Sequence, residues 1–160
     1  MDRSTDRILV THVGSLPRSD ELIEVMIAED QGNPVPQAEY DQKLTDAVNG
    51  IVAKQVELGI DCVDDGEFSK RGFAVYAHER LGGLTPTGKK RPSPWADSRE
   101  SREFPEFYSP ITKDSIGAPN PRNAQMACTE KLTYKGNALL ERDLDNLTKA
   151  VKANNVSEAF

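Results

Sequence analysis

The sequence predicts an α/β fold in which strands alternate with helices and pair in parallel. Short apolar segments at about 7–13 and 60–64 are predicted strands, and a third is expected near Ala127–Tyr134. The segments between and after them place apolar residues at helical spacing. The resulting order, β-α-α-β-α, a long insertion and β-α, implies right-handed crossovers between parallel strands.

The composition limits what this protein binds and where it works. Of its 160 residues, 37% are hydrophobic and 29% are charged, which predicts one domain with a thin core. The net charge of -6 argues against nucleic acid or an anionic membrane as the main partner. No apolar run approaches the roughly 18 residues of a membrane span, and the first ten residues lack the apolar part of a secretory signal. Because two cysteines cannot form a disulfide framework, we expect a cytoplasmic protein.

The first β-α pair is marked by residue types with known local preferences. Residues 7–13 are apolar and β-branched and stop at Gly14, which is typical of a buried parallel strand followed by a turn. Ser19 offers an N-cap for a helix that runs to about Asp30. Glycine and proline within 31–34 end that helix.

A longer helix is expected from about Pro36 to Leu58. Its apolar face contains one polar residue, Gln55. Gly59 stands where a left-handed C-cap residue belongs, and the second strand, Ile60–Asp64, follows directly. Helix, glycine, strand and turn therefore succeed one another within a few residues.

The segment 82–123 is expected to be an irregular, partly ordered insertion. Seven of the ten prolines fall between Pro86 and Pro121, together with the one tryptophan, Trp95. The basic run 89–91 is interpreted as a solvated loop.

A final helix carries the clearest helical pattern of the chain. Its predicted apolar stripe consists of Leu140, Leu144, Leu147 and Val151. Three parallel strands leave a wide sheet edge unpaired, which a complete protein normally pairs or covers. We therefore expect residues 1–160 to be the N-terminal part of one larger β/α domain.

Two segments at predicted strand ends are candidates for a binding site, because parallel β/α folds place their sites there. Ser15, at the end of the first strand, offers a hydroxyl and a backbone amide. Glu67, after the second strand, offers a carboxylate suited to an ammonium group. Gly14 and Gly66 have no Cβ, so a ligand could approach the backbone closely at these positions. The alternative is an ordinary strand-end turn, in which serine and aspartate cap the next helix.

Other polar residues carry weaker hypotheses. His12 is either a substrate contact or a packed, hydrogen-bonded histidine, and His78 is expected on the surface. Cys62 and Cys128 are far apart and have no cysteine or histidine close in sequence, so spacing alone assembles no metal site. The acidic run 64–67 offers a general acid and base, but no nucleophile accompanies it.

Three blocks of the sequence resemble the start of the catalytic barrel of cobalamin-independent methionine synthases. The first is Thr11–Arg18, and the second runs from Gln55 through Gly59 to Phe68. A third block, 128–147, is similar to shorter, single-barrel members of that superfamily. The resemblance spans almost the whole chain and only the first part of the family's barrel.

The resemblance implies a partial (β/α)8 TIM barrel, its first three βα units interrupted by the Pro-rich insertion. It further implies transfer of a methyl group from a methylated folate to homocysteine, whose thiol is bound to zinc as a thiolate. By this resemblance the residues that hold the amino-acid part of homocysteine are Val13, Gly14, Ser15 and Glu67. Cys128 falls where the pterin is contacted, although the arginine that often accompanies it is absent. The family's zinc ligands lie on later strands, so we expect this chain alone to be inactive.

Two alternatives remain open. A zinc enzyme that joins epoxides to coenzyme M would share the barrel and the thiolate chemistry, but it would leave Glu67 without an ammonium partner. A small non-catalytic α/β domain would fold by itself. The partners expected under the leading hypothesis are a small thiol, a methylated folate and the remainder of the barrel.

Overall fold

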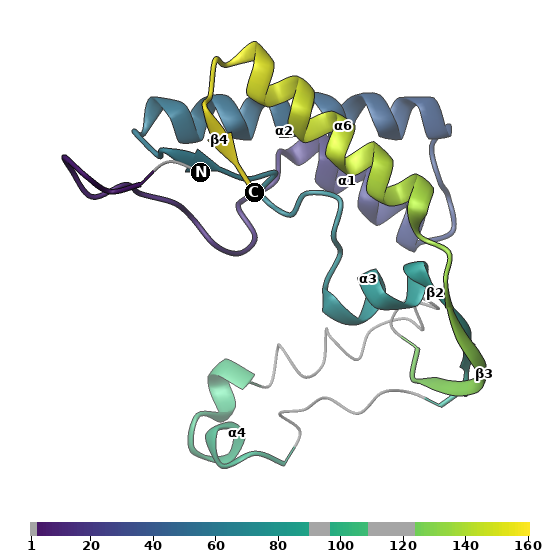
Figure 1. Cartoon of the computed structure of the whole chain (residues 1–160). Helices are drawn as coiled ribbons and strands as arrows, with labels where there is room; N and C mark the ends of the chain where they lie inside the picture. Colours follow the sequence, from purple (N-terminus) through teal and green to yellow (C-terminus); the bar gives the residue numbers. More distant parts are fainter. Residues whose placement is uncertain (1–2, 90–96, 109–123) are drawn as a thin grey trace. The chain divides into compact units, whose positions relative to one another are not determined.

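The computed structural model describes residues 3–89, 97–108 and 124–160, which divide into two units (Figure 1). The first unit comprises Met1–Phe73 and Gly136–Phe160, and the second comprises Ala74–Lys135. The predicted mixture of helices with a few short strands is confirmed. Among the described residues, no helix combines the length and apolar character needed to cross a membrane.

Three helices form most of the first unit: α1 (Asp20–Asp30), α2 (Gln37–Glu57) and α6 (Asn137–Ala153). Ser19 caps α1 because its hydroxyl accepts a hydrogen bond from the backbone N–H of Leu22. The predicted bounds of α1 and α2 are confirmed to within one residue at each end. The capping and helix-breaking residues in the sequence therefore predicted the bounds of both helices correctly.

The parallel strands of the first unit are shorter than predicted. Strand β1 (Cys62–Val63) pairs in parallel with β4 (Glu158–Ala159), and Phe160 N–H extends this pairing by donating to the Val63 carbonyl at 3.1 Å. Strand β4 was not predicted. Only two residues take part in it, too few to show a periodic pattern.

The predicted buried strand at 7–13 is wrong. The segment makes one isolated parallel bridge, between Thr11 and Cys62, and it contains no other strand pairing. Ile8 is 83% exposed and Val13 is 77% exposed. Because Val10 N–H donates to the side chain of Asp61 and not to a neighbouring strand, the local composition did not produce a regular ladder.

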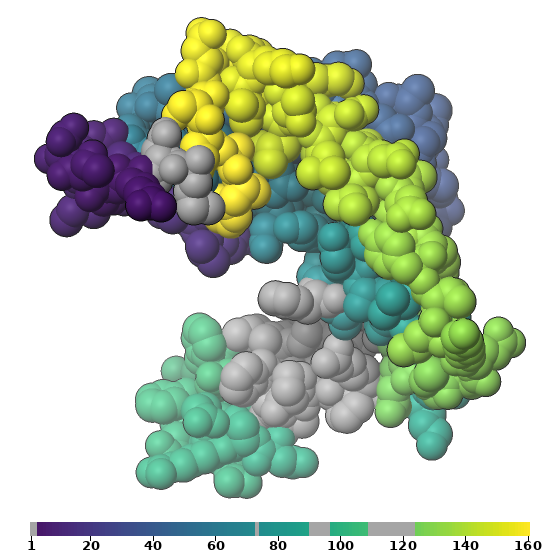
Figure 2. Space-filling view, viewed as in Figure 1, coloured from purple at the N-terminus to yellow at the C-terminus, as the bar shows by residue number. Residues whose placement is uncertain are grey.

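The core of the first unit lies between α2 and its neighbours, α1 and α6. Its buried members are Leu22, Val25, Met26, Tyr40, Leu44, Val48, Val52, Val63, Phe68 and Ala150. Figure 2 shows α6, in yellow-green, lying over part of α2. The core is mostly aliphatic, with one tyrosine and one phenylalanine.

Helix α6 does not bury the stripe that its sequence predicts. Leu140 is 39% exposed and Leu144 is 54% exposed, whereas Asn146 and Ala150 are buried. The face that packs contains a polar contact with α2: the hydroxyl of Thr45 donates to Asn146 Oδ1 at 2.8 Å. The face that packs is therefore displaced from the leucine stripe, and only its C-terminal half is partly buried.

The second unit contains α3, which begins at the boundary (Phe73–Arg80), β2 (Leu81–Pro86), α4 (Arg99–Glu103) and β3 (Met126–Tyr134). The third predicted strand exists at β3, but the expectation of parallel pairing is wrong. Strand β3 pairs with β2 in an antiparallel arrangement that joins Leu81 to Tyr134 and Pro86 to Met126.

The prediction that 82–123 is irregular is therefore wrong at the start of this range, where β2 lies, and at α4. Strand β2 escaped notice because two glycines interrupt its apolar pattern. Gly83 has a φ of +87°, and an added Cβ there would lie 2.7 Å from the Lys131 carbonyl oxygen. Glycine is thus required where the two strands approach closely at a register shift. Trp95, residues 90–91 and much of the Pro-rich segment lie outside the described residues.

Candidate functional site

The ends of the two N-terminal segments meet through a direct side-chain contact. Ser15 Oγ donates a hydrogen bond to Glu67 Oε2 at 2.7 Å. Beside it, the backbone N–H of Leu16 donates to the Gly66 carbonyl at 3.0 Å. The two residues on which the binding-site hypothesis rests therefore share one place in the first unit. Their contact with a substrate stays a prediction.

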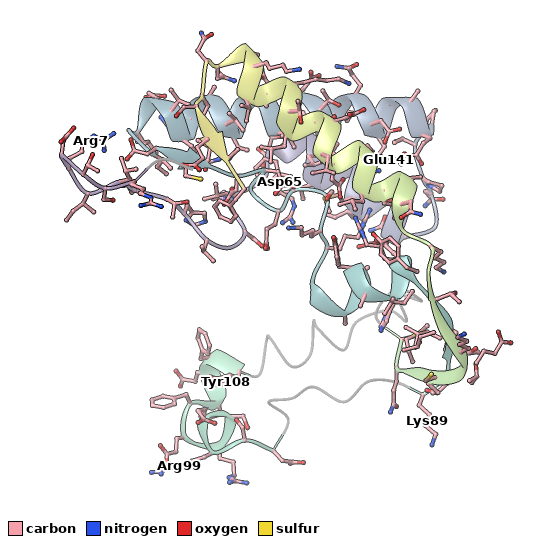
Figure 3. The ribbon with its side chains drawn as sticks, in the orientation of Figure 1. Arg7, Asp65, Lys89, Arg99, Tyr108 and Glu141 are labelled. Atoms are coloured by element: carbon pink, nitrogen blue, oxygen red, sulfur yellow. The ribbon has the colours of Figure 1, made fainter. Side chains whose placement is uncertain are left out.

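The loop that carries Glu67 follows β1 and turns sharply (Figure 3, where Asp65 is labelled). Gly66 has a φ of +65° and Glu67 a φ of +56°, so two successive residues are left-handed. An added Cβ at Gly66 would lie 2.6 Å from the ring of Phe68, so glycine is required for space as well as for conformation. A glutamate held in this conformation costs free energy, which the surrounding contacts must offset.

The two aspartates before Glu67 stabilise this turn. Asp64 Oδ1 accepts from Gly66 N–H at 2.7 Å, and Asp65 Oδ1 accepts from Glu67 N–H at 2.9 Å. Both are Asx turns, in which an aspartate side chain accepts a hydrogen bond from the backbone N–H two residues later. The alternative of an ordinary strand-end turn thus describes these aspartates well, and it weakens their interpretation as a general acid and base.

Gln55, the polar residue on the apolar face of α2, attaches the loop to the core. It is 2% exposed, and its side-chain amide forms hydrogen bonds with both backbone groups of Asp64. Nε2 donates to the Asp64 carbonyl at 2.8 Å, and Oε1 accepts from Asp64 N–H at 3.1 Å. A polar side chain in an otherwise apolar face was the sequence signal for this role.

Arg18 also binds this loop, and its role was not predicted. Its guanidinium donates to three carbonyl oxygens: Glu67 at 2.8 Å, Phe68 at 3.2 Å and Lys70 at 2.6 Å. Lys70 Nζ lies 3.8 Å from Glu67 Oε1, opposite the Ser15 contact. The Glu67 carboxylate therefore has a hydroxyl on one oxygen and an ammonium near the other.

Burial changes the ionisation of two groups at the site. It raises the pKa of Asp64, which is 5% exposed, against the opposing effects of the Gly66 N–H bond and of His12. Burial also lowers the pKa of Arg18, whose bonded partners are neutral carbonyls. Both groups lie at the base of the loop, where Asp64 is buried and Arg18 half-buried.

The remaining site candidates differ in their surroundings. His12 Nε2 lies 3.0 Å from the Gly14 carbonyl oxygen, so its ring bonds to its own loop. Gly14 has a φ of +104°. Val13 is exposed. For these three residues, a role in binding substrate stays a prediction.

Neither cysteine belongs to the contact around Glu67. Cys128 is exposed on β3 of the second unit, where its thiol donates to the Glu130 carbonyl, and Cys62 lies on β1. His78 is half-buried on α3, which corrects its expected surface position; its Nδ1 is enclosed without a hydrogen-bond partner among the described residues. Over those same residues, no group of three or more histidine, cysteine, aspartate or glutamate side chains is placed to hold a metal ion.

These features define an α/β protein in which a serine hydroxyl and a glutamate carboxylate meet just beyond the parallel strand β1. The family described as "Cobalamin-independent synthase, Catalytic domain" matches residues 8–140, most of the chain, and the chain belongs to this family. The match includes both segments that meet at Ser15 and Glu67.

Curated relatives agree with the family assignment. The chain is similar to proteins named 5-methyltetrahydropteroyltriglutamate--homocysteine methyltransferase from Lactococcus lactis and Streptomyces griseus. It is 29% identical to the first over 105 residues, which cover 64% of this chain and 13% of the relative. It is 27% identical to the second over 111 residues, covering 69% and 13%. The aligned part of this chain thus spans a small fraction of either relative.

Proposed function

We propose that this chain holds the amino-acid end of homocysteine in an enzyme that transfers a methyl group from a methylated folate to homocysteine, producing methionine. Family membership and the names of the relatives support this reaction. The observation that carries the proposal is the 2.7 Å contact between Ser15 and Glu67. It joins a hydroxyl and a carboxylate at the ends of segments that approach in parallel.

The chemistry of homocysteine fits these groups. Its ammonium would pair with the Glu67 carboxylate in a charge-assisted hydrogen bond. Its carboxylate would accept bonds from the Ser15 hydroxyl and from backbone N–H groups near Val13 and Gly14. On binding, the Ser15 hydroxyl would turn from Glu67 to the substrate. The thiol, at the other end of the molecule, would remain free to react.

In the proposed reaction the thiol sulfur loses its proton and forms a bond to the methyl carbon, while the bond from that carbon to the folate nitrogen breaks. The electron pair of the broken bond stays on the nitrogen, which takes up one proton, so the products are methionine and the demethylated folate. The described residues do not fit a zinc site, so we assign them no zinc ion and no step that depends on one. We propose that the zinc ligands, and the remaining units of a (β/α)8 barrel, lie outside the described residues. A folate contact at Cys128 and a cytoplasmic location are parts of the same proposal.

The proposal is tested by titrating the ¹⁵N-labelled chain with L-homocysteine and following the backbone resonances. We expect shifts concentrated at Ser15 and Glu67. The matched ligand 4-mercaptobutyrate lacks only the amino group, so it should bind about tenfold or more weakly if an ammonium–carboxylate bond is lost. Glu67→Gln should abolish the difference between the two ligands, whereas Glu57→Gln, at an exposed glutamate of α2, should preserve it.

Other outcomes would contradict the proposal. Shifts with coenzyme M and none with homocysteine would favour the epoxide-transferring alternative. Equal affinity for homocysteine and 4-mercaptobutyrate would show that Glu67 does not bind the ammonium group. The absence of shifts with any of the three ligands would leave a non-catalytic domain as the better hypothesis.

A further inference from the structure

Arg18 occupies an unusual position for a charged side chain next to a carboxylate. It lies three residues after Ser15, yet its guanidinium donates to backbone carbonyls and not to the carboxylate of Glu67. Nε donates to Phe68, and Nη2 donates to both Glu67 and Lys70. Three carbonyls from four consecutive residues therefore converge on one guanidinium group.

This convergence stabilises the conformation that presents Glu67. The residue is left-handed, and a glutamate adopts this conformation only where its surroundings enforce it. Arg18 satisfies carbonyls on the loop at Glu67 and on its C-terminal side, and Asp65 satisfies its N–H. Burying part of a guanidinium costs free energy, which its three hydrogen bonds to the loop offset.

We propose that Arg18 is a positioning residue: it fixes the turn that directs the Glu67 carboxylate toward Ser15, and it thereby sets the affinity for the ammonium end of the substrate. The last part of this inference rests on the proposed function. The first part, the control of the turn, does not. Lysine cannot replace Arg18 fully, because one ammonium group lacks the fixed, divergent donors of a guanidinium.

Arg71 provides a matched control in the same loop. Its side chain is 9% exposed and pairs with Glu29 and Asp30 at the end of α1, and it donates to the Met26 carbonyl at 2.7 Å. Arg71 is thus another shielded arginine that attaches this loop to the first unit. Its hydrogen bonds go to α1 and not to the carbonyls bound by Arg18. Its loss should affect stability without moving Glu67.

The first test needs no ligand. Amide hydrogen exchange is measured at Leu16, which donates to Gly66, and at Glu67, which donates to Asp65, each relative to Val52 in the core of α2. In Arg18→Met, we expect both relative exchange rates to rise about tenfold, because the equilibrium between the closed and the open turn would shift tenfold toward the open form. Arg71→Met should leave both ratios unchanged. Arg18→Lys should lie between the wild type and Arg18→Met.

The second test uses affinity. Arg18→Met should weaken homocysteine binding about tenfold and 4-mercaptobutyrate binding much less, because only the former depends on the ammonium contact. In a Glu67→Gln background, Arg18→Met should have little further effect on the affinity for homocysteine, since Arg18 influences binding only by positioning Glu67. General destabilisation would not change the ratio between the two ligands.

The outcomes separate the two proposals. Unchanged exchange ratios in Arg18→Met, or equal increases in Arg71→Met, would overturn the role of Arg18 whether or not homocysteine binds. Faster exchange in Arg18→Met with no homocysteine binding by the wild type would retain Arg18 as the residue that fixes the turn and would reject the proposed function. If Arg18→Met does not fold, Arg18→Lys provides the same comparison.

Discussion

The two segments that meet at the candidate site are held in different ways. The loop around Glu67 is attached to buried groups: Gln55 binds it from α2, and Arg18 binds three of its carbonyls. The segment before Ser15 is largely exposed; it is held by one isolated bridge, by the Thr11 hydroxyl bound to the Cys62 carbonyl and by the carboxylate of Asp61. The comparison indicates that the loop is the more firmly held half of the candidate site and that the segment before Ser15 is ordered with less stabilisation.

Removing the buried attachment of the loop should have the largest effect. Gln55→Leu would leave the Asp64 N–H and carbonyl without their partners in the core. Each buried, unsatisfied group costs about 1–3 kcal/mol, so we expect a loss of roughly 3 kcal/mol in the free energy of unfolding. Urea denaturation measures this change.

Gln42→Leu is the matched control, because Gln42 lies on the same helix and is exposed, with its amide donating to Asp46. We expect its effect to stay within about 0.5 kcal/mol. Equal losses in the two variants would show that Gln55 does not attach the loop to the core.

The next prediction separates conformation from space at the turn itself. Gly66→Ala introduces a Cβ that would lie 2.6 Å from the Phe68 ring, and it also strains a left-handed residue. Gly59→Ala introduces the same kind of strain at φ +79°, but with no atom within 4 Å. We expect Gly59→Ala to cost about 1 kcal/mol and Gly66→Ala at least 1–2 kcal/mol more, because overpacking adds to the strain.

Thermal and urea unfolding of both variants would test this difference. If Gly66→Ala were no worse than Gly59→Ala, the loop would have enough freedom to move Phe68 aside. The loop would then not be the rigid half of the site.

The same contrast explains how much the sequence alone could predict. Ser19 and Gly59 located helices α1 and α2, because caps and breakers act through the residues next to them. The contact between Ser15 and Glu67 was expected because both follow predicted parallel strands. Arg18 was missed as a functional residue, since bonds from a side chain to backbone carbonyls leave no spacing in the sequence.

Pairing between distant segments was harder to predict. Apolar periodicity located β3 but not its partner, and the glycines of β2 concealed an antiparallel neighbour. On α6 the leucine stripe was right for Leu147 and Val151, which pack against the core, and wrong for the N-terminal half, where Asn146 bonds to Thr45 of α2. In both cases the decisive interaction involves residues that are remote in sequence, so no local pattern records it.

The smallest expected effect is on how stability depends on pH. The contributions of Asp61, which binds the segment before Ser15, and of Asp64, in the loop, should change with pH in opposite directions. Arg7 and Val10 N–H hold the pKa of Asp61 at about 2. This contribution to stability is present above the unfolded pKa of about 4 and is lost as the pH falls toward 2. Burial instead raises the pKa of Asp64, so its contribution is present at low pH and declines as the pH rises through its raised pKa.

Amide exchange at Val10 and Gly66 between pH 2 and 7, corrected for the intrinsic rate, measures the two effects separately. We expect Val10 to lose protection on acidification, and Asp61→Asn to remove that change because asparagine does not titrate. Gly66 should show no such loss between pH 4 and 2, since its acceptor, Asp64, keeps an oxygen able to accept when it is protonated. Parallel loss of protection at both amides would mean that the segment before Ser15 and the loop open together, and the two halves of the site would then form one cooperative element.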